Sequence, residues 1–106
     1  MMNNTKWTEI FKAFYYGYEC AQDENLRNIQ IPWTTRALNG YEYSDNTWTH
    51  FGMDMEHSRE IEWLKIWLTP ENREIVLDIL RKIHVPGEVQ ENCVVVYGHR
   101  MDVDYI

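Results

Sequence analysis

Residues 60–71 read EIEWLKIWLTPE and join a strand-like run to a helix start. From Trp63 onward the run is apolar on both sides of the chain except at Lys65, a pattern that favours a central strand. After it, Thr69 supplies a capping hydroxyl, Pro70 suits the first helical position, and Glu71 suits the positive end of the helix dipole. The segment therefore predicts a central strand followed by a helix.

Hydrophobic periodicity and helix-ending residues predict the elements after this strand. A helix reaching about Ile83 is predicted because apolar residues repeat along one face: Ile75, Val76, Ile79, Leu80 and Ile83. Pro86 and Gly87 end it. Residues 92–97 (NCVVVY) are apolar on both faces and predict a last strand.

The N-terminal half predicts one helix and several strands. Over residues 5–20, large apolar side chains recur at helical spacing: Trp7, Ile10, Phe11, Phe14 and Tyr18. Strands are expected at 29–38 and 47–51, and whether residues 41–43 add a further short strand stays open. Asn39-Gly40 is a turn signal, and Gly52 to Arg59 is a polar connection.

Together these elements predict an α+β fold with an antiparallel or mixed four-stranded sheet packed by two helices, in the order α-β-β-β-α-β. We expect a single domain over residues 1–106, with 98–106 as a polar, loosely held tail. Two helices cannot easily cover both faces of such a sheet. An aromatic sheet surface should therefore be left over, and exposed apolar patches often mark interfaces.

Composition excludes several classes of protein. Of the 106 residues, 44% are hydrophobic and 25% are charged, as in ordinary globular domains and unlike disordered chains. No run approaches the roughly 18 apolar residues of a membrane span, so no membrane partner is expected. The first residues, MMNNTK, contain no apolar signal core, and we therefore expect a cytoplasmic protein.

The negative charge gathers in the middle of the chain. The net charge is −7, and residues 41–62 hold six acidic side chains against Arg59 alone, a local charge of −5. This distribution argues against nucleic acid as a partner, since phosphate binding needs clustered Lys and Arg. It suits a basic protein partner, because opposite fields speed encounter.

No motif indicates catalysis, a metal or a cofactor, and none of these is expected. Ser44 and Ser58 lie in polar turns, and residues 54–57 (DMEH) lack the spacing of a known metal site. Cys20 and Cys93 are 73 positions apart and are predicted to be free, buried thiols.

The same middle segment interleaves acidic with aromatic residues. Glu60 and Glu62 are expected on one face of a strand, about 7 Å apart. Tyr and Trp are favoured interface anchors, and a rim of carboxylates would select a basic partner. The predicted partner-binding residues are Glu42, Tyr43, Asp45, Trp48, Asp54, Glu56, Glu60 and Glu62.

Three segments resemble a small uncharacterised bacterial protein family: residues 3–7 (NNTKW), 61–63 (IEW) and 83–88 (IHVPGE). That resemblance implies no activity and no catalytic residues. In size, acidity and α+β pattern the chain is similar to immunity proteins of bacterial toxin systems, including contact-dependent growth inhibition. This second likeness implies a cytoplasmic protein that neutralises a basic toxin domain, such as a nuclease.

Two other functions stay open. The first is a self-associating structural or regulatory module, for which a homodimer would form through the aromatic sheet face. The second is a small enzyme.

Overall fold

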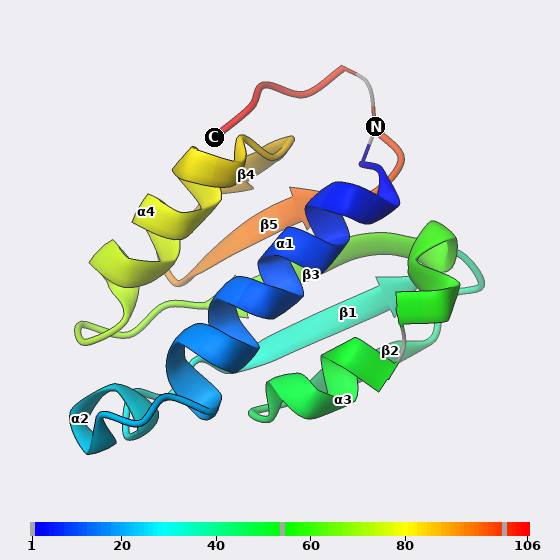
Figure 1. Cartoon of the computed structure of the whole chain (residues 1–106). Helices are drawn as coiled ribbons and strands as arrows, with labels where there is room; N and C mark the ends of the chain where they lie inside the picture. The colour runs from blue at the N-terminus through cyan, green and yellow to red at the C-terminus, as the bar shows by residue number, and fades with distance from the viewer. Residues whose placement is uncertain (1, 54, 101) are drawn as a thin grey trace.

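The computed structural model describes residues 2–53, 55–100 and 102–106. The fold is α+β, as predicted, with an open antiparallel sheet in the order β2-β1-β3-β5-β4 (Figure 1). The five strands are β1 (Trp33–Ala37), β2 (Glu42–Asp45), β3 (Ile61–Trp67), β4 (Gly87–Val89) and β5 (Cys93–Tyr97). The prediction of four strands was wrong because β4 is only three residues long and contains glycine and glutamate, which give no strand signal.

The helices differ more from the prediction. The described residues form α1 (Asn4–Phe14), a π-helical turn η1 (Tyr15–Glu19), α2 (Glu24–Arg27), α3 (Trp48–Met53), a 3₁₀ segment η2 (Met55–Glu60) and α4 (Arg73–Ile83). The predicted strand at 47–51 is wrong, since residues 48–51 belong to the helix α3. The predicted order of elements therefore fails at this point.

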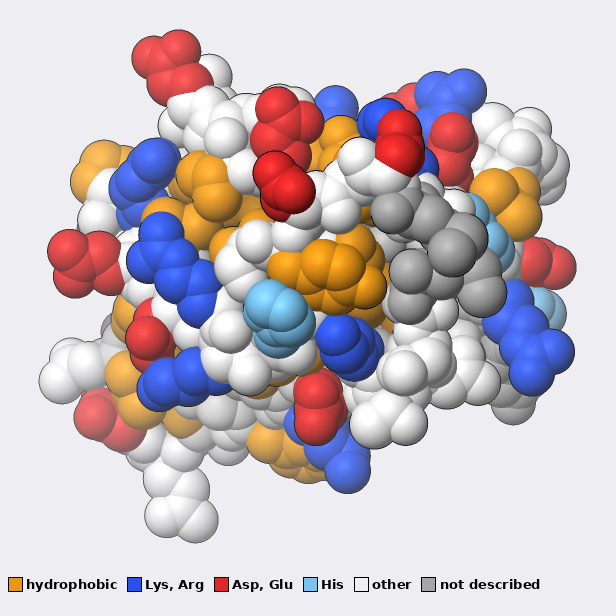
Figure 2. Space-filling model, turned by 90° about the horizontal axis from the view of Figure 1, so that it is seen from above, with side chains coloured by type: hydrophobic (Ala, Val, Ile, Leu, Met, Phe, Trp, Pro, Cys, Tyr) orange, Lys and Arg blue, Asp and Glu red, His pale blue; other side chains and the backbone are white. Residues whose placement is uncertain are grey.

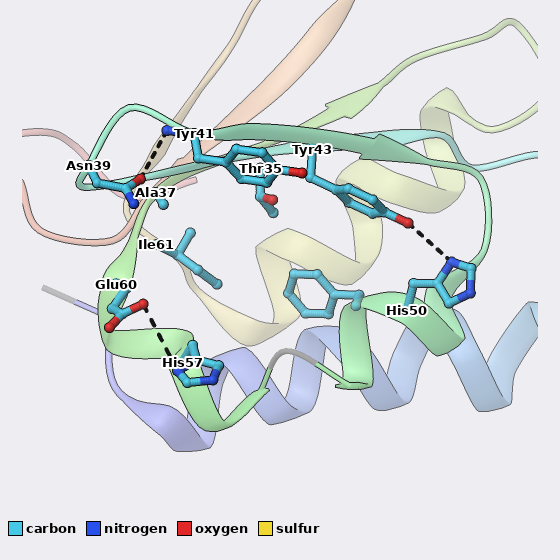
Figure 3. A pocket seen from close by; sticks show the side chains of 10 residues that line it. Thr35, Ala37, Asn39, Tyr41, Tyr43, His50, His57, Glu60 and Ile61 are labelled. Carbon is cyan, nitrogen blue, oxygen red and sulfur yellow. Dashed lines mark hydrogen bonds and ion pairs between the residues drawn. The ribbon is translucent and has the colours of Figure 1, made fainter.

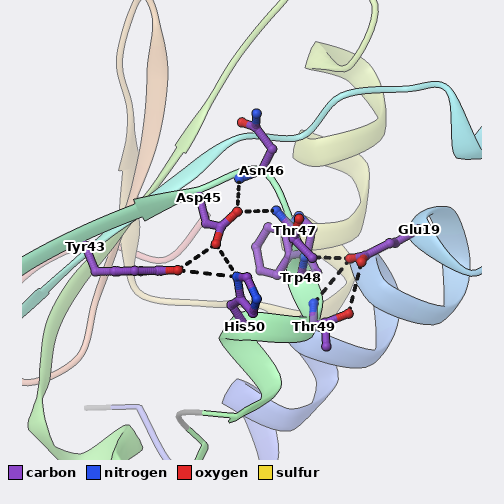
Figure 4. Close-up of polar contacts among 8 residues, drawn as sticks. All are labelled: Glu19, Tyr43, Asp45, Asn46, Thr47, Trp48, Thr49 and His50. Atoms are coloured by element: carbon purple, nitrogen blue, oxygen red, sulfur yellow. Dashed lines mark hydrogen bonds and ion pairs between the residues drawn. The ribbon is translucent and has the colours of Figure 1, made fainter.

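A distant carboxylate explains why α3 is a helix. Glu19, at the end of η1, accepts hydrogen bonds from the backbone N–H groups of Trp48 at 2.5 Å and Thr49 at 3.3 Å, and from the Thr49 hydroxyl at 3.0 Å (Figure 4). These are the amides that a helix leaves without an internal partner. Trp48 and Phe51, three residues apart, then share one helical face and are both buried.

The helices α1, α3 and α4 lie on the same face of the sheet (Figure 1). Between them and the sheet sits one core, to which each layer contributes: Trp7, Ile10 and Phe14 from α1, Trp48 and Phe51 from α3, Val76 and Leu80 from α4, and Leu64, Ile66, Val94 and Val96 from the sheet. Alternation along β3 and β5 directs these strand residues to the helices.

The sheet face opposite the helices has tryptophan side chains and corresponds to the aromatic surface that the sequence predicts. Trp67 is 38% exposed, and its Nε1 donates a 3.0 Å hydrogen bond to Oγ1 of Thr34. The Lys65 Nζ lies 4.6 Å from the centroid of the Trp63 ring. No helix of the described residues packs here. Cys93 is buried on this face, whereas Cys20 is exposed, so the prediction of a buried thiol at Cys20 was wrong.

The C-terminal segment, which was predicted to be a loosely held tail, runs beside β4. The Ile106 amide donates to the Val85 carbonyl at 2.8 Å, and the Gly87 amide donates to the Asp104 carbonyl at 3.0 Å. The Tyr105 ring stacks on His84. On the face of the molecule that Figure 2 shows, acidic, basic and hydrophobic side chains are interspersed, and no large patch carries charge of a single sign.

The described helices are all too short or too polar to cross a lipid bilayer.

Candidate functional site

The hairpin of β1 and β2 presents two large side chains to solvent. Its turn is the predicted one at Asn39-Gly40, where Gly40 has a φ of +92° and the Asn39 side chain accepts a hydrogen bond from the Tyr41 amide at 3.0 Å. A left-handed φ suits glycine because it has no Cβ. The turn leaves Leu38 56% exposed and Tyr41 66% exposed.

Backbone contacts hold this hairpin beside the end of η2. The Leu38 amide donates a 2.8 Å hydrogen bond to the carbonyl of Glu60. One residue later β3 begins, and Ala37 pairs with Ile61 after a bulge in the register. The hairpin tip and the Glu60 carboxylate therefore share one end of the sheet.

A pocket of about 470 Å³ opens between the hairpin and the segment formed by α3 and η2 (Figure 3). This volume falls in the range of ligand-binding clefts. Its apolar lining comes from Ala37, Phe51 and Ile61. The remaining described lining residues are polar or aromatic: Thr35, Asn39, Tyr41, Tyr43, His50, His57 and Glu60.

Two histidine–carboxylate pairs stand at this pocket. His50 Nδ1 contacts Asp45 Oδ2, and the Tyr43 hydroxyl donates to the same Asp45 oxygen at 2.6 Å (Figure 4). At the other end His57 Nδ1 lies 3.9 Å from Glu60 Oε2, with both side chains mostly exposed. The first pair is tightly bonded and the second is loose.

Asp45 is held as a carboxylate by the groups around it. The hydrogen bond from His50 lowers the pKa of Asp45 most, followed by the bond from Tyr43. The backbone amides of Asn46 and Thr47 donate to its other oxygen at 2.7 and 3.0 Å. These bonds fix the turn from β2 into α3, so Asp45 has a structural task.

Glu42 and Glu62 lie on the other side of the sheet. Arg36 bridges them, with Nη1 2.8 Å from Glu42 and Nε 3.1 Å from Glu62. The expectation that Glu60 and Glu62 share a strand face is wrong, because Glu60 ends η2 before β3 begins. Glu60 instead lines the pocket.

Of the remaining predicted residues, Trp48 lies in the core and not at this surface. Trp48 is only 2% exposed and donates from Nε1 to the Ile31 carbonyl at 3.0 Å, inside the core. Asp54 lies outside the described residues, and Glu56 belongs to η2. The structure thus gathers Glu42, Tyr43, Glu60 and Glu62 around the hairpin, on two sides of the sheet.

Sequence reasoning missed the pocket and the exposed pair at the hairpin tip. The Asn-Gly turn is a local signal that could have placed Leu38 and Tyr41 at a tip. His50 and His57 carried no such signal, because their meeting at one pocket depends on α3, whose residues had been predicted as a strand.

The Asp45–His50 pair resembles part of a nucleophilic site. A carboxylate that orients an imidazole is one half of a catalytic triad. However, Ser44 hydrogen-bonds Thr34 at 2.7 Å, and Ser58 hydrogen-bonds Asn4 at 2.6 Å, so neither serine is paired with His50. Within the described ranges no three His, Cys, Asp or Glu side chains are grouped to hold a metal ion.

Comparison with known proteins gives the family but no activity. No curated protein and no solved structure matches the chain. One family model matches over residues 1–102, which is nearly the whole chain, and this supports the resemblance to an uncharacterised family. The chain therefore belongs to DUF6678, a family of unknown function.

Proposed function

We propose that this protein is an immunity-type binding protein that blocks a basic toxin domain through its β1–β2 hairpin. The contact region, called here the hairpin surface, consists of Leu38, Tyr41, Glu42, Glu60 and Glu62. Small size, acidity and an α+β fold are the general characters that it shares with immunity proteins.

The observation that carries this proposal is the exposure of Leu38 and Tyr41 beside carboxylates. Leu38 is 56% and Tyr41 66% exposed, and the Leu38 amide is bonded to the carbonyl of Glu60. Apolar and aromatic anchors surrounded by a polar rim are the usual anatomy of a protein–protein contact.

Charge indicates the kind of partner. The hairpin surface contains three carboxylates, and Arg36 is the cation that contacts two of them. The whole chain has a net charge of −7. A partner with a basic active-site cleft would be attracted and oriented by this field.

The proposed surface keeps Glu42, Glu60 and Glu62 of the set predicted from sequence and adds Leu38 and Tyr41. Tyr43 and Asp45 are left out of the hairpin surface, because the hydrogen bond between them fixes the turn that leads into α3. Trp48 supports it from the core. Substitutions at Asp45 and Trp48 would alter binding only by disturbing the fold, whereas Tyr43 also lines the pocket.

The test uses a basic toxin domain encoded beside the gene for this protein. Cells producing that domain should survive with the wild-type protein and lose protection with Tyr41→Ala or Glu60→Lys. The matched control is Glu9→Lys, a reversal on exposed α1 away from the hairpin. Circular dichroism must show that each variant folds. Full protection by both folded hairpin variants would rule out the hairpin surface, whatever the effect of Glu9→Lys.

Self-association is a second candidate, favoured by the uncovered sheet face. Trp67 is 38% exposed there, on the same strand face as the half-buried Trp63. A second copy of the chain could cover both rings in a two-fold contact. Sedimentation equilibrium would then give a mass that rises with concentration, and Trp67→Ser would abolish the rise. A monomer mass at every concentration would exclude this candidate.

A further inference from the structure

We propose that the pocket beside Glu60 receives an arginine side chain of the basic partner. This inference rests on the proposed function and adds the chemistry that the hairpin surface recognises. It depends on three features of the pocket: an available carboxylate, an exposed aromatic ring and an apolar lining.

Glu60 is the carboxylate that is available to a partner. Glu42 and Glu62 are already bonded to Arg36, and Asp45 accepts bonds from His50, Tyr43 and two backbone amides. In contrast, the Glu60 side chain is 69% exposed, and its one ionic neighbour in the described part of the chain is His57, at 3.9 Å. A partner cation can therefore bind Glu60 without breaking a hydrogen bond of the fold.

The walls suit the rest of an arginine side chain. Ala37, Phe51 and Ile61 offer apolar contact to its methylene groups, and Tyr41 stands exposed at the rim (Figure 3). Arginine commonly buries its stem against apolar surface while its charged head stays polar. Its planar guanidinium also stacks on aromatic rings and binds a carboxylate through two parallel N–H bonds.

The charges facing the pocket disfavour an anionic ligand. Glu60 lines it, and the two histidines that could attract an anion each stand beside a carboxylate: His50 beside Asp45 and His57 beside Glu60. A phosphate or carboxylate would meet that negative charge on entry. Lysine shares the positive charge of arginine but lacks the planar fork, so it should bind more weakly.

The experiment is an NMR titration of the full ¹⁵N-labelled chain with N-acetyl-arginine amide. Backbone signals of Tyr41, His57 and Ile61 should shift saturably in the millimolar range. The lysine analogue should shift them less, and the citrulline analogue, which has the same shape without charge, should not shift them. Glu60→Gln should weaken arginine binding about tenfold, as expected for loss of a charge-assisted bond. Glu9→Gln is the matched control and should bind like wild type.

The outcomes separate this inference from the proposed function. Equal shifts with citrulline, unchanged affinity in Glu60→Gln, or an absence of shifts at the pocket would each overturn the arginine pocket. The proposed function would then still stand if Tyr41→Ala abolished protection against the toxin domain. Conversely, specific arginine binding with full protection by both hairpin variants would support the pocket chemistry and overturn the hairpin as the toxin-binding surface.

Discussion

The ring of Phe14 stacks on the ring of Trp48, with 4.6 Å between the centroids and 25° between the planes. Both side chains are buried, and they join α1 to α3 beneath the hairpin. This contact places Trp48 in the folding core, although its sequence position suggested an interface anchor.

The first prediction follows from that stack. Phe14→Ala should lower the free energy of unfolding by about 3–5 kcal/mol, because it removes a large buried ring and leaves a cavity. Urea denaturation followed by circular dichroism measures the change. Tyr16→Ala is the control, since Tyr16 is exposed at the surface of η1. Similar losses in the two variants would contradict a core role for Phe14.

The second prediction concerns the capping carboxylate of α3. Glu19→Ala should cost about 1 kcal/mol of stability, since it removes the acceptor for the Trp48 and Thr49 amides. Glu9→Ala, a change to a solvent-exposed carboxylate on α1, should cost much less. Denaturant midpoints of the two variants provide the comparison. A Glu19→Ala midpoint equal to that of Glu9→Ala would show that α3 forms without this cap.

The same capping bond explains where the sequence analysis failed. Residues 47–51 (TWTHF) are rich in threonine and aromatic residues, which favour a strand, but Trp48 and Phe51 are three apart and suit one face of a helix. Glu19, nearly thirty positions away, decides between the two, and no local pattern contains that information. By contrast, β3, β5 and the apolar face of α4 were predictable from hydrophobic burial. The predicted start of α4 was wrong, since the helix begins at Arg73 after Asn72 and not at Pro70.

The candidate site was predictable only in its composition. Acidic and aromatic residues of 41–62 do lie near the hairpin, but their grouping depends on long-range packing. A bulge between β1 and β3 and the end of η2 send Glu60 and Glu62 to different sides of the sheet. The pocket requires η2 and α3 to face the hairpin, which neither spacing nor charge indicates.

The third prediction is a pH dependence at Asp45. The pKa of this carboxyl is lower in the folded chain, mainly through the bond from His50. A carboxyl with a depressed folded pKa stabilises the fold above its unfolded pKa of about 3.9. That contribution is lost as the pH falls from there toward the folded pKa.

Asp45→Asn should therefore melt at a lower temperature than wild type at pH 6, and the gap should narrow toward pH 3. Thermal melts of the two proteins across this range measure the effect. Asparagine keeps the size of the side chain but removes its charge. A gap that stays constant, or widens in acid, would contradict the predicted sign.

The last prediction concerns the association rate with the basic toxin domain of the proposed function. Exposed charges separated by more than about 8 Å are largely screened at physiological salt. The association rate should therefore fall as sodium chloride is raised, while the dissociation rate changes little. Stopped-flow fluorescence, using the exposed Trp67 or a label on the toxin, measures both rates.

Glu60→Gln should lower the association rate at low salt and flatten its salt dependence, because one steering charge is removed. Tyr41→Ala should instead raise the dissociation rate, since its ring would provide short-range contact rather than a long-range field. Glu60→Gln should also raise the dissociation rate, because it removes the bond to the partner arginine, so the salt dependence of the association rate is what separates charge from contact area in the hairpin surface. An association rate that does not change with salt would contradict electrostatic steering. The effect of Tyr41→Ala on the dissociation rate would then test the contact made by the Tyr41 ring on its own.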